Sequence, residues 1–150
     1  MNDDILLRID KEGRWFYQDE EITHRKTYLL FSRHLSRDDA GRYVLRIGQE
    51  QCPVEVEDAP FVVKTIDFLP LEGQGMKAIW LTLNDETREP LDLPTLRIGP
   101  GNVPYCRVRG GMFEARFSRN AYQLLARLIQ QDEEQDHYSI TLDGKKHELR

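Results

Sequence analysis

The chain has 150 residues, of which 39% are hydrophobic and 31% charged, and its formal net charge is −5. A chain of this length forms one large domain or two small lobes on a shared core, without needing a disulfide or metal. It contains no apolar run of about 18 residues, so no membrane span is expected. The acidic start Met1–Asp4 does not resemble a signal peptide, and the two cysteines, Cys52 and Cys106, fit a reducing compartment. We therefore expect a cytoplasmic protein.

The first part of the chain is predicted to form a hairpin, a helix and a second hairpin. Alternating apolar residues and turn residues mark these elements. Thr23 is the expected N-cap of the helix, and Tyr28, Phe31 and Leu35 form its core-facing stripe. The predicted elements are the strands 5–9 and 14–17, the helix 24–35, and the strands 42–47 and 51–57.

The stretch Val54–Val63 is the point around which the chain is organised. It begins as an alternating strand and continues as the apolar run Phe61-Val62-Val63, which is typical of a strand buried on both faces. Between the two parts, Pro60 cannot donate to a central ladder, so the strand bends or ends there. We expect a structural corner at Glu57, Asp58 and Pro60, with the Asp58 carboxylate accepting backbone N–H bonds.

The rest of the chain is predicted to repeat the pattern of the first part. Ser118 is the expected N-cap of a second helix, whose apolar face runs from Ala121 to Ile129. The residues between the early strands and this helix, 84–104, are expected to be turns and irregular segments. The predicted strands are 61–69, 76–83, 105–109, 112–117, 138–142 and 145–149, with a loop over 70–75 and a polar segment over 130–136.

An internal duplication follows from this order of elements. Tyr28–Arg33 aligns with Tyr122–Arg127, and Tyr43–Ile47 aligns with Tyr138–Leu142, with a slip of one residue between the two alignments. We predict an α+β fold in which a hairpin–helix–hairpin unit occurs twice, with antiparallel sheets. The expected lobes are residues 1–62 and 63–150, which share a core and a continuous sheet through residues 57–63.

Several stretches resemble a bacterial family called domain of unknown function 1285. They include Arg8-Ile-Asp10, Gly13-Arg-Trp-Phe-Tyr17, Gly41-Arg-Tyr43, Val54–Phe61 and Pro104-Tyr105 with Val108-Arg109. The resemblance implies a duplicated α+β core whose C-terminal half is superficially similar to pleckstrin-homology-like barrels. It also implies a ligand or macromolecule bound near the interface of the halves. No activity is assigned to the family.

The motifs of catalysis and of metal binding are not recognisable in the sequence. The four histidines and two cysteines do not have the spacing of zinc ligands, and there is no nucleophile elbow. Adjacent carboxylates such as Asp85-Glu86 point to opposite faces when extended, so they are no acid/base pair by themselves. We expect no catalytic residues, no metal and no cofactor.

Positive charge is concentrated in residues 93–131, which contain six arginines and a single acidic residue, Glu114. We expect Arg107, Arg109, Arg116 and Arg119, with Tyr105, to form a binding site for an anionic partner, with Arg119 at the positive end of a helix. The alternative is that these arginines form ordinary ion pairs with Glu57, Glu114 and other carboxylates.

The function that fits best is a non-catalytic binding or regulatory module for a protein or nucleic-acid partner, for example in signal transduction. The alternative is an enzyme acting on a small anionic substrate in the cleft between the lobes.

Overall fold

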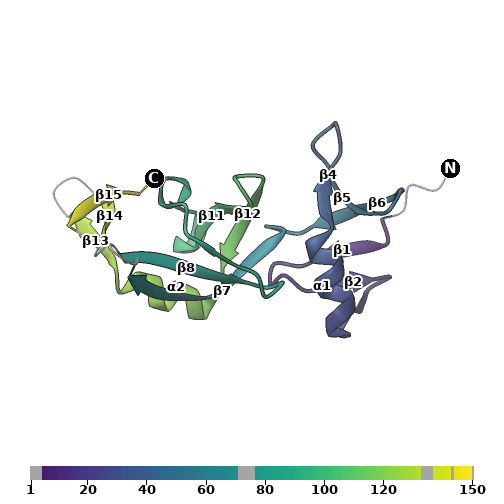
Figure 1. Cartoon of the computed structure of the whole chain (residues 1–150), viewed down its shortest axis with the longest axis horizontal. Coiled ribbons are helices and arrows are strands. Elements are labelled where there is room, and N and C mark those ends of the chain that lie inside the picture. Colours follow the sequence, from purple (N-terminus) through teal and green to yellow (C-terminus); the bar gives the residue numbers. More distant parts are fainter. Residues whose placement is uncertain (1–4, 71–76, 133–136, 143, 150) are drawn as a thin grey trace.

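The computed structural model describes residues 5–70, 77–132, 137–142 and 144–149, and strands predominate among them. These residues form two α-helices, two six-stranded sheets and one three-stranded sheet, in agreement with the α+β class. The first sheet lies at one end of the molecule and the three-stranded sheet at the other, and β7 and β8 run between them (Figure 1).

The first sheet has the strand order β3-β2-β1-β6-β5-β4. It consists of two antiparallel three-stranded ribbons joined by one parallel pair, β1 with β6. The prediction of antiparallel sheets is therefore wrong at this pair: the crossover through α1 (Arg25–Arg33) returns the chain beside β1 in the same direction. The strands are β1 (Leu7–Ile9), β2 (Trp15–Tyr17), β3 (Glu20–Glu21), β4 (Leu35–Arg37), β5 (Tyr43–Ile47) and β6 (Glu50–Val56).

The second sheet has the order β10-β11-β12-β7-β8-β9 and the same construction, with β12 and β7 as the parallel pair. Because β6 and β7 belong to different sheets, the prediction of one continuous sheet through residues 57–63 is wrong. The strands are β7 (Phe61–Pro70), β8 (Lys77–Leu83), β9 (Arg88–Pro90), β10 (Arg97–Ile98), β11 (Pro104–Val108) and β12 (Phe113–Phe117). The segment predicted as irregular thus contains β9 and β10, and also the short 3-10 helices η1 (Leu93–Thr95) and η2 (Pro100–Asn102).

The chain ends in helix α2 (Arg119–Ala126) and a sheet of β13 (Ile129–Asp132), β14 (His137–Leu142) and β15 (Lys145–Glu148). The helix is shorter than predicted, because Ile129 begins a strand instead of continuing the helical face. Of the predicted loop over 70–75, Pro70 is the last residue of β7, and of the predicted polar segment over 130–136, residues 130–132 belong to β13. The other residues of both segments, the start of the next strand at Met76 and the turn residue Asp143 lie outside the described residues.

The order of elements repeats in the two halves, which is consistent with an internal duplication. A three-stranded ribbon, a helix and a second three-stranded ribbon occur as β1–β3, α1, β4–β6 and again as β10–β12, α2, β13–β15. The aligned segments Tyr43–Ile47 and Tyr138–Leu142 are both middle strands of the last ribbon. The pairing differs, since β1 pairs with the last ribbon of its own unit whereas β12 pairs with β7.

Two hairpins of the first sheet close with the same five-residue turn, Asp-x-x-Gly-Arg. Asp10 accepts hydrogen bonds from the backbone N–H (2.8 Å) and the Nε (2.8 Å) of Arg14, and Asp38 accepts the same two bonds (2.9 Å each) from Arg42. Burial alone would raise the pKa of Asp10, but the bonds from Arg14 and from the N–H of Glu12 hold that pKa below its ordinary value. These turns give a structural role to Asp10, Gly13, Arg14, Gly41 and Arg42, which are among the residues that carry the family resemblance.

The two helices differ in how they begin. Helix α2 starts as predicted, because the Ser118 side chain accepts a hydrogen bond from the N–H of Ala121 (3.1 Å). Helix α1 starts at Arg25 with His24 as N-cap, so the predicted cap at Thr23 is wrong. The buried face of α1 includes Ser32, whose hydroxyl accepts a 2.8 Å bond from the indole N–H of buried Trp15.

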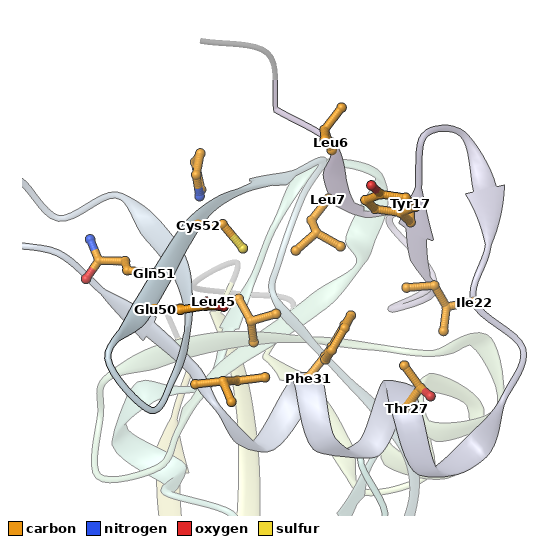
Figure 2. A pocket seen from close by; sticks show the side chains of 12 residues that line it. Leu6, Leu7, Tyr17, Ile22, Thr27, Phe31, Leu45, Glu50, Gln51 and Cys52 are labelled. Atoms are coloured by element: carbon orange, nitrogen blue, oxygen red, sulfur yellow. The ribbon is translucent and has the colours of Figure 1, made fainter. Parts of the chain in front are cut away.

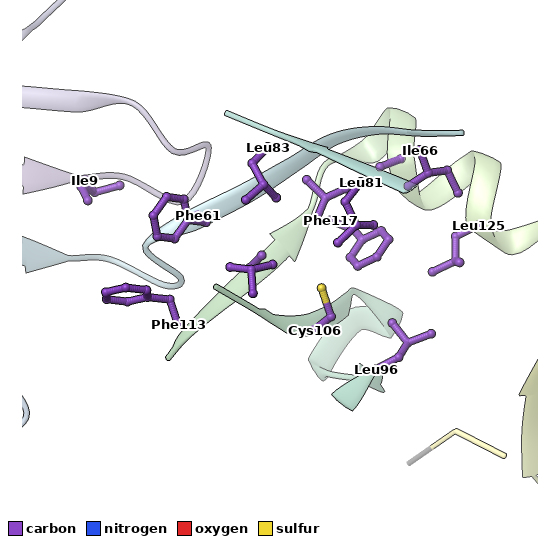
Figure 3. Close-up of a cluster of buried hydrophobic side chains, with 14 of the residues drawn as sticks. Ile9, Phe61, Ile66, Leu81, Leu83, Leu96, Cys106, Phe113, Phe117 and Leu125 are labelled. Carbon is purple, nitrogen blue, oxygen red and sulfur yellow. The ribbon is translucent and has the colours of Figure 1, made fainter. Parts of the chain in front are cut away.

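One hydrophobic core extends through both halves of the chain (Figure 3). Each residue of the run Phe61–Val63 is at most 1% exposed, as expected of a strand covered on both faces. Phe61 packs edge-on against Phe113, with ring centroids 5.4 Å apart. Leu125 of α2 is also completely buried, so the predicted inner face of that helix is correct at this position.

The turn between β8 and β9 holds the two halves together. The Asn84 side chain accepts a bond from the N–H of Val62 (3.0 Å) and donates one to the carbonyl of Gly13 (3.1 Å) in the first hairpin. Two residues further along the same turn, the Glu86 carboxylate binds the Arg25 guanidinium at the start of α1. This turn therefore fixes β7, the first hairpin and α1 relative to one another.

Candidate functional site

The predicted arginines do not share one surface. Arg107 lies exposed on β11, and its guanidinium donates to the carbonyl of Gly111 (3.1 Å). Arg109 belongs to the predicted strand 105–109, but it follows the end of β11 with a φ of +55°. This left-handed conformation breaks the alternation of the strand, so the Arg109 side chain leaves the face that Arg107 occupies.

Arg109 points to the interior, where it binds the carboxylate of Asp85, a side chain with 0% exposure. Its guanidinium also lies 4.5 Å from the centre of the Phe61 ring and donates to the carbonyl of Ser32 (3.4 Å). The backbone N–H of Arg109 bonds to Glu89 (3.2 Å). With these partners, Arg109 joins the β11–β12 turn to α1 and to the β8–β9 turn, and it is a structural residue.

Tyr105 and Arg116 face each other across β11 and β12 and both bind Asp58. The Tyr105 hydroxyl donates to Asp58 Oδ2 (2.7 Å), and Arg116 Nη1 donates to the same oxygen (3.3 Å). Burial, followed by the hydrogen bond to Asp58 and its negative charge, raises the pKa of Tyr105. Asp58 thus fastens the corner to the second sheet through side chains, not through the backbone N–H groups that we predicted.

The other two corner residues have separate environments. The Glu57 carboxylate accepts a 2.6 Å bond from the backbone N–H of Lys11 in the first hairpin, where an arginine partner had been considered. Pro60 is buried directly before β7, between the two sheets. The corner therefore lies at the junction of the halves.

Beside this junction lies a cleft of about 400 Å³ whose cations come from three elements. Lys11 belongs to the first hairpin, Arg116 to β12, and Arg119 is the first residue of α2. Glu12 is the acidic residue at this cleft among the described residues, so positive charge prevails there. Of the arginines predicted to bind an anion, the structure brings Arg116 and Arg119 together here, whereas Arg107 and Arg109 lie elsewhere.

Arg119 and Ser118 give the cleft two different polar groups. Arg119 is exposed, and no ion pair to it forms within the described part of the chain. The Ser118 hydroxyl is occupied, because it donates to the carbonyl of Lys64 (3.0 Å) and accepts from the N–H of Ala121. The cleft can therefore attract an anion through Arg119, while Ser118 shapes the start of the helix.

Sequence reasoning missed two features. Asp85 is fully buried, although its place in a polar turn indicated a solvated residue; its partner Arg109 is 24 residues away, and no local pattern links the two. A large apolar cavity in the first half also went unpredicted. The adjacent apolar residues Leu45 and Ile47 on one strand face were the available signal for it.

Two further observations limit the kinds of site. Within the described ranges, no three side chains of histidine, cysteine, aspartate or glutamate gather as metal ligands would. None of the helices described is long and apolar enough to cross a membrane.

Comparison with known proteins finds one matching family model and solved structures with a similar fold. Residues 1–59 match the model of the N-terminal domain of the domain of unknown function DUF1285. A crystal structure of a DUF1285 family protein from Silicibacter pomeroyi DSS-3 is similar with a TM-score of 0.76 and 27% identity, over 97% of this chain and 80% of that one. A second, from Shewanella baltica OS155, has a TM-score of 0.67 and 21% identity, over 84% and 94% of the two chains. No curated protein matches the chain.

The fold is thus that of an α+β protein with two six-stranded mixed sheets. The match of residues 1–59 and the structural likeness confirm the resemblance to the DUF1285 family, and the first part of this chain is similar to the family's N-terminal domain.

Proposed function

We propose that this protein is a non-catalytic binding module that recognises an acidic segment of a partner protein. The observation that carries the proposal is the cleft at the junction of the halves, where the exposed cations Lys11 and Arg119 outnumber Glu12, beside Arg116 with its partner Asp58. Arg119 extends this positive surface at the N-terminal end of α2, where backbone N–H groups and the helix dipole also favour negative charge. Recognition of this kind suits a regulatory role, for example in signal transduction.

An acidic protein segment suits the surface better than a nucleic acid. The net charge of −5 repels a long polyanion, so attraction is confined to the cleft. Two candidate rings for base stacking are already engaged: Trp15 is only 1% exposed, and the guanidinium of Arg8 lies 4.3 Å from the centre of the Phe16 ring. A protein partner with a few carboxylates matches a cleft of this size.

The alternative function is an enzyme that acts on a small anionic substrate in the same cleft. The hydrogen bonds of Ser118 favour binding over catalysis, because a hydroxyl that caps a helix and bonds to Lys64 is not positioned as a nucleophile. In this proposal the module works in the cytoplasm, where thiols such as the exposed Cys52 stay reduced. The likeness of the C-terminal half to pleckstrin-homology-like barrels and the lobe boundary at residue 62 stay predictions.

A binding comparison tests the proposal. The probes are a fluorescent hexaglutamate peptide and a single-stranded hexathymidylate. The variants are the double substitution Lys11→Ala with Arg119→Ala, and Arg127→Ala, which removes an exposed arginine at the other end of α2. We expect the double variant to bind the peptide about fivefold more weakly, since two exposed ion pairs are lost, and Arg127→Ala to bind normally.

Three results would contradict the proposal. Equal loss in Arg127→Ala would mean that net charge, and not the cleft, attracts the peptide. Tighter binding of hexathymidylate that depends on Lys11 and Arg119 would favour a nucleic-acid partner. Turnover of p-nitrophenyl phosphate that Arg119→Ala abolishes would favour the enzyme.

A further inference from the structure

The first half of the chain contains a cavity of about 840 Å³ between helix α1 and the sheet strands β1, β5 and β6. Figure 2 shows Leu7, Leu45, Phe31 and Cys52 directed toward this common space from the four elements. Leu7 and Leu45 are themselves buried and belong to the hydrophobic core, so they form a preorganised apolar floor. Ligand sites for small molecules have volumes of about 300–1,000 Å³ and predominantly apolar walls, as this cavity has.

Apolar side chains also gather at the rim of the cavity. Leu6, Tyr17 and Ile47 line it and are 43%, 48% and 36% exposed. Large apolar side chains scattered singly on a surface need no explanation, but a cluster around a hollow marks a binding site. A bound apolar molecule would remove this rim from water and rest on the apolar floor.

A charged residue at the rim determines which kind of head group an apolar ligand can carry. Among the lining residues within the described part of the chain, Glu50 is the one with a formal charge. It pairs with Ile47 across β5 and β6, on the same strand face as the neighbouring pair Leu45 and Cys52. The negative charge of Glu50 also acts on Cys52, which lines the cavity: burial, and then the charge of Glu50, raise the pKa of the Cys52 thiol. A negative head group would be repelled at this position and a positive one attracted.

We propose that this cavity binds a small apolar molecule that carries a cationic group at one end, with the apolar part between α1 and the sheet and the cation beside Glu50. The site is separate from the cleft at Lys11 and Arg119, with which it shares no residue. The proposal of a ligand in this cavity can therefore be tested independently of the proposed recognition of an acidic protein.

Cys52 offers a reporter inside the site. It is exposed and lines the cavity, whereas Cys106 is 1% exposed, and burial raises the pKa of the Cys106 thiol far above its ordinary value. N-ethylmaleimide should therefore label Cys52 alone, and Cys52→Ser should abolish the labelling. The probes are decylamine, decanol and decanoate, used below their micelle concentrations, with affinity measured by calorimetry and occupancy of the cavity by the rate of labelling.

We expect decylamine to slow the labelling of Cys52 and to bind at least about fivefold more tightly than decanoate, with decanol between them, as attraction and repulsion at an exposed carboxylate predict. In Glu50→Gln the amine and the carboxylate should bind within about twofold of each other, while decanol binds as before. Ile47→Lys, which places a cation at the half-exposed rim, should reverse the order and favour decanoate.

Several outcomes would overturn the proposal. No protection of Cys52 by any of the three probes would mean that the cavity does not take such a ligand. An unchanged preference in Glu50→Gln would remove the role of that carboxylate. A labelling rate that falls as protein concentration rises, together with a dimer in sedimentation, would show that a second copy of the chain covers the cavity instead.

Discussion

Arg109 and Asp85 form an ion pair that joins two turns of the second sheet beneath helix α1. The carboxylate is completely buried and the guanidinium is 23% exposed. Asp85 also accepts bonds from the N–H (3.1 Å) and the hydroxyl (2.5 Å) of Thr87, so its charge is surrounded by donors. The pair belongs to the contacts that hold the halves together, which is why an arginine with the appearance of a ligand-binding residue serves the structure instead.

Removal of Arg109 should therefore destabilise the protein. Arg109→Ala leaves the Asp85 charge buried with fewer partners, and we expect the free energy of unfolding to fall by about 3–5 kcal/mol. Arg107→Ala, which removes an exposed arginine two residues away, should cost less than about 0.5 kcal/mol. Urea melts of the two variants measure the difference. Similar midpoints for both would contradict the structural role of Arg109.

The two Asp-x-x-Gly-Arg turns provide a matched pair of glycine substitutions. Gly13 and Gly41 have φ values of +79° and +82°, so alanine is strained by about 1–2 kcal/mol at either position. A Cβ at Gly13 would lie 2.8 Å from Asn84 Nδ2 and 2.9 Å from Val62 Cγ2, whereas at Gly41 it meets no atom within 4 Å.

We expect the free energy of unfolding of Gly41→Ala to fall only by the strain energy. In Gly13→Ala it should fall by about 1–3 kcal/mol more, because overpacking disturbs the Asn84 contacts between the halves. Thermal unfolding compares the two variants. Equal losses would show that the first hairpin does not pack against Asn84 and Val62.

The pKa of Tyr105 predicts a loss of stability at high pH. Its pKa is raised in the folded protein, so the folded state keeps a proton that the unfolded state loses near the ordinary tyrosine pKa of about 10. The associated stability is fully present below pH 10 or so and is lost as the pH rises through the folded pKa. Tyr105→Phe should therefore show a smaller decline between pH 9 and 12, roughly the range that spans both values.

Asp58→Asn provides the companion measurement. It removes the negative charge next to the Tyr105 hydroxyl but leaves its burial, so it should lower the pKa of Tyr105 only in part. Absorbance of tyrosinate follows the titration in the parent protein and in Asp58→Asn, and the signal that is missing in Tyr105→Phe identifies the part that belongs to Tyr105. An alkaline decline that is identical in the parent protein and in Tyr105→Phe would assign the effect to other groups.

Local patterns predicted the parts of this fold that local interactions determine. The apolar run Phe61–Val63 is a buried strand, and Ser118 caps its helix. The prediction failed where distant residues decide the outcome. Ile129 pairs with Ile140 in a strand although its helical spacing from Ala121 and Leu125 is good, because sheet pairing there outweighs helical periodicity.

The candidate site shows the same division. The concentration of arginines in residues 93–131 was visible in the sequence, and so was the position of Arg119 at a helix start. The sequence did not reveal which arginines remain available for a ligand, because a positive φ at one residue turns Arg109 inward to Asp85. Likewise, Lys11 joins Arg119 only through the packing of the first hairpin near α2.

The salt dependence of peptide binding tests the proposed function most directly. Raising the salt concentration from about 0.1 M to about 1 M shortens the Debye length from about 10 Å to about 3 Å and screens exposed charges. If the cleft binds an acidic segment, the affinity for hexaglutamate falls steeply over this range in the parent protein and in Arg127→Ala. The fall should be shallower in the Lys11→Ala, Arg119→Ala variant, whose melting curve stays that of the parent because both residues are exposed. Affinity independent of salt, or an equal slope in the double variant, would contradict the account.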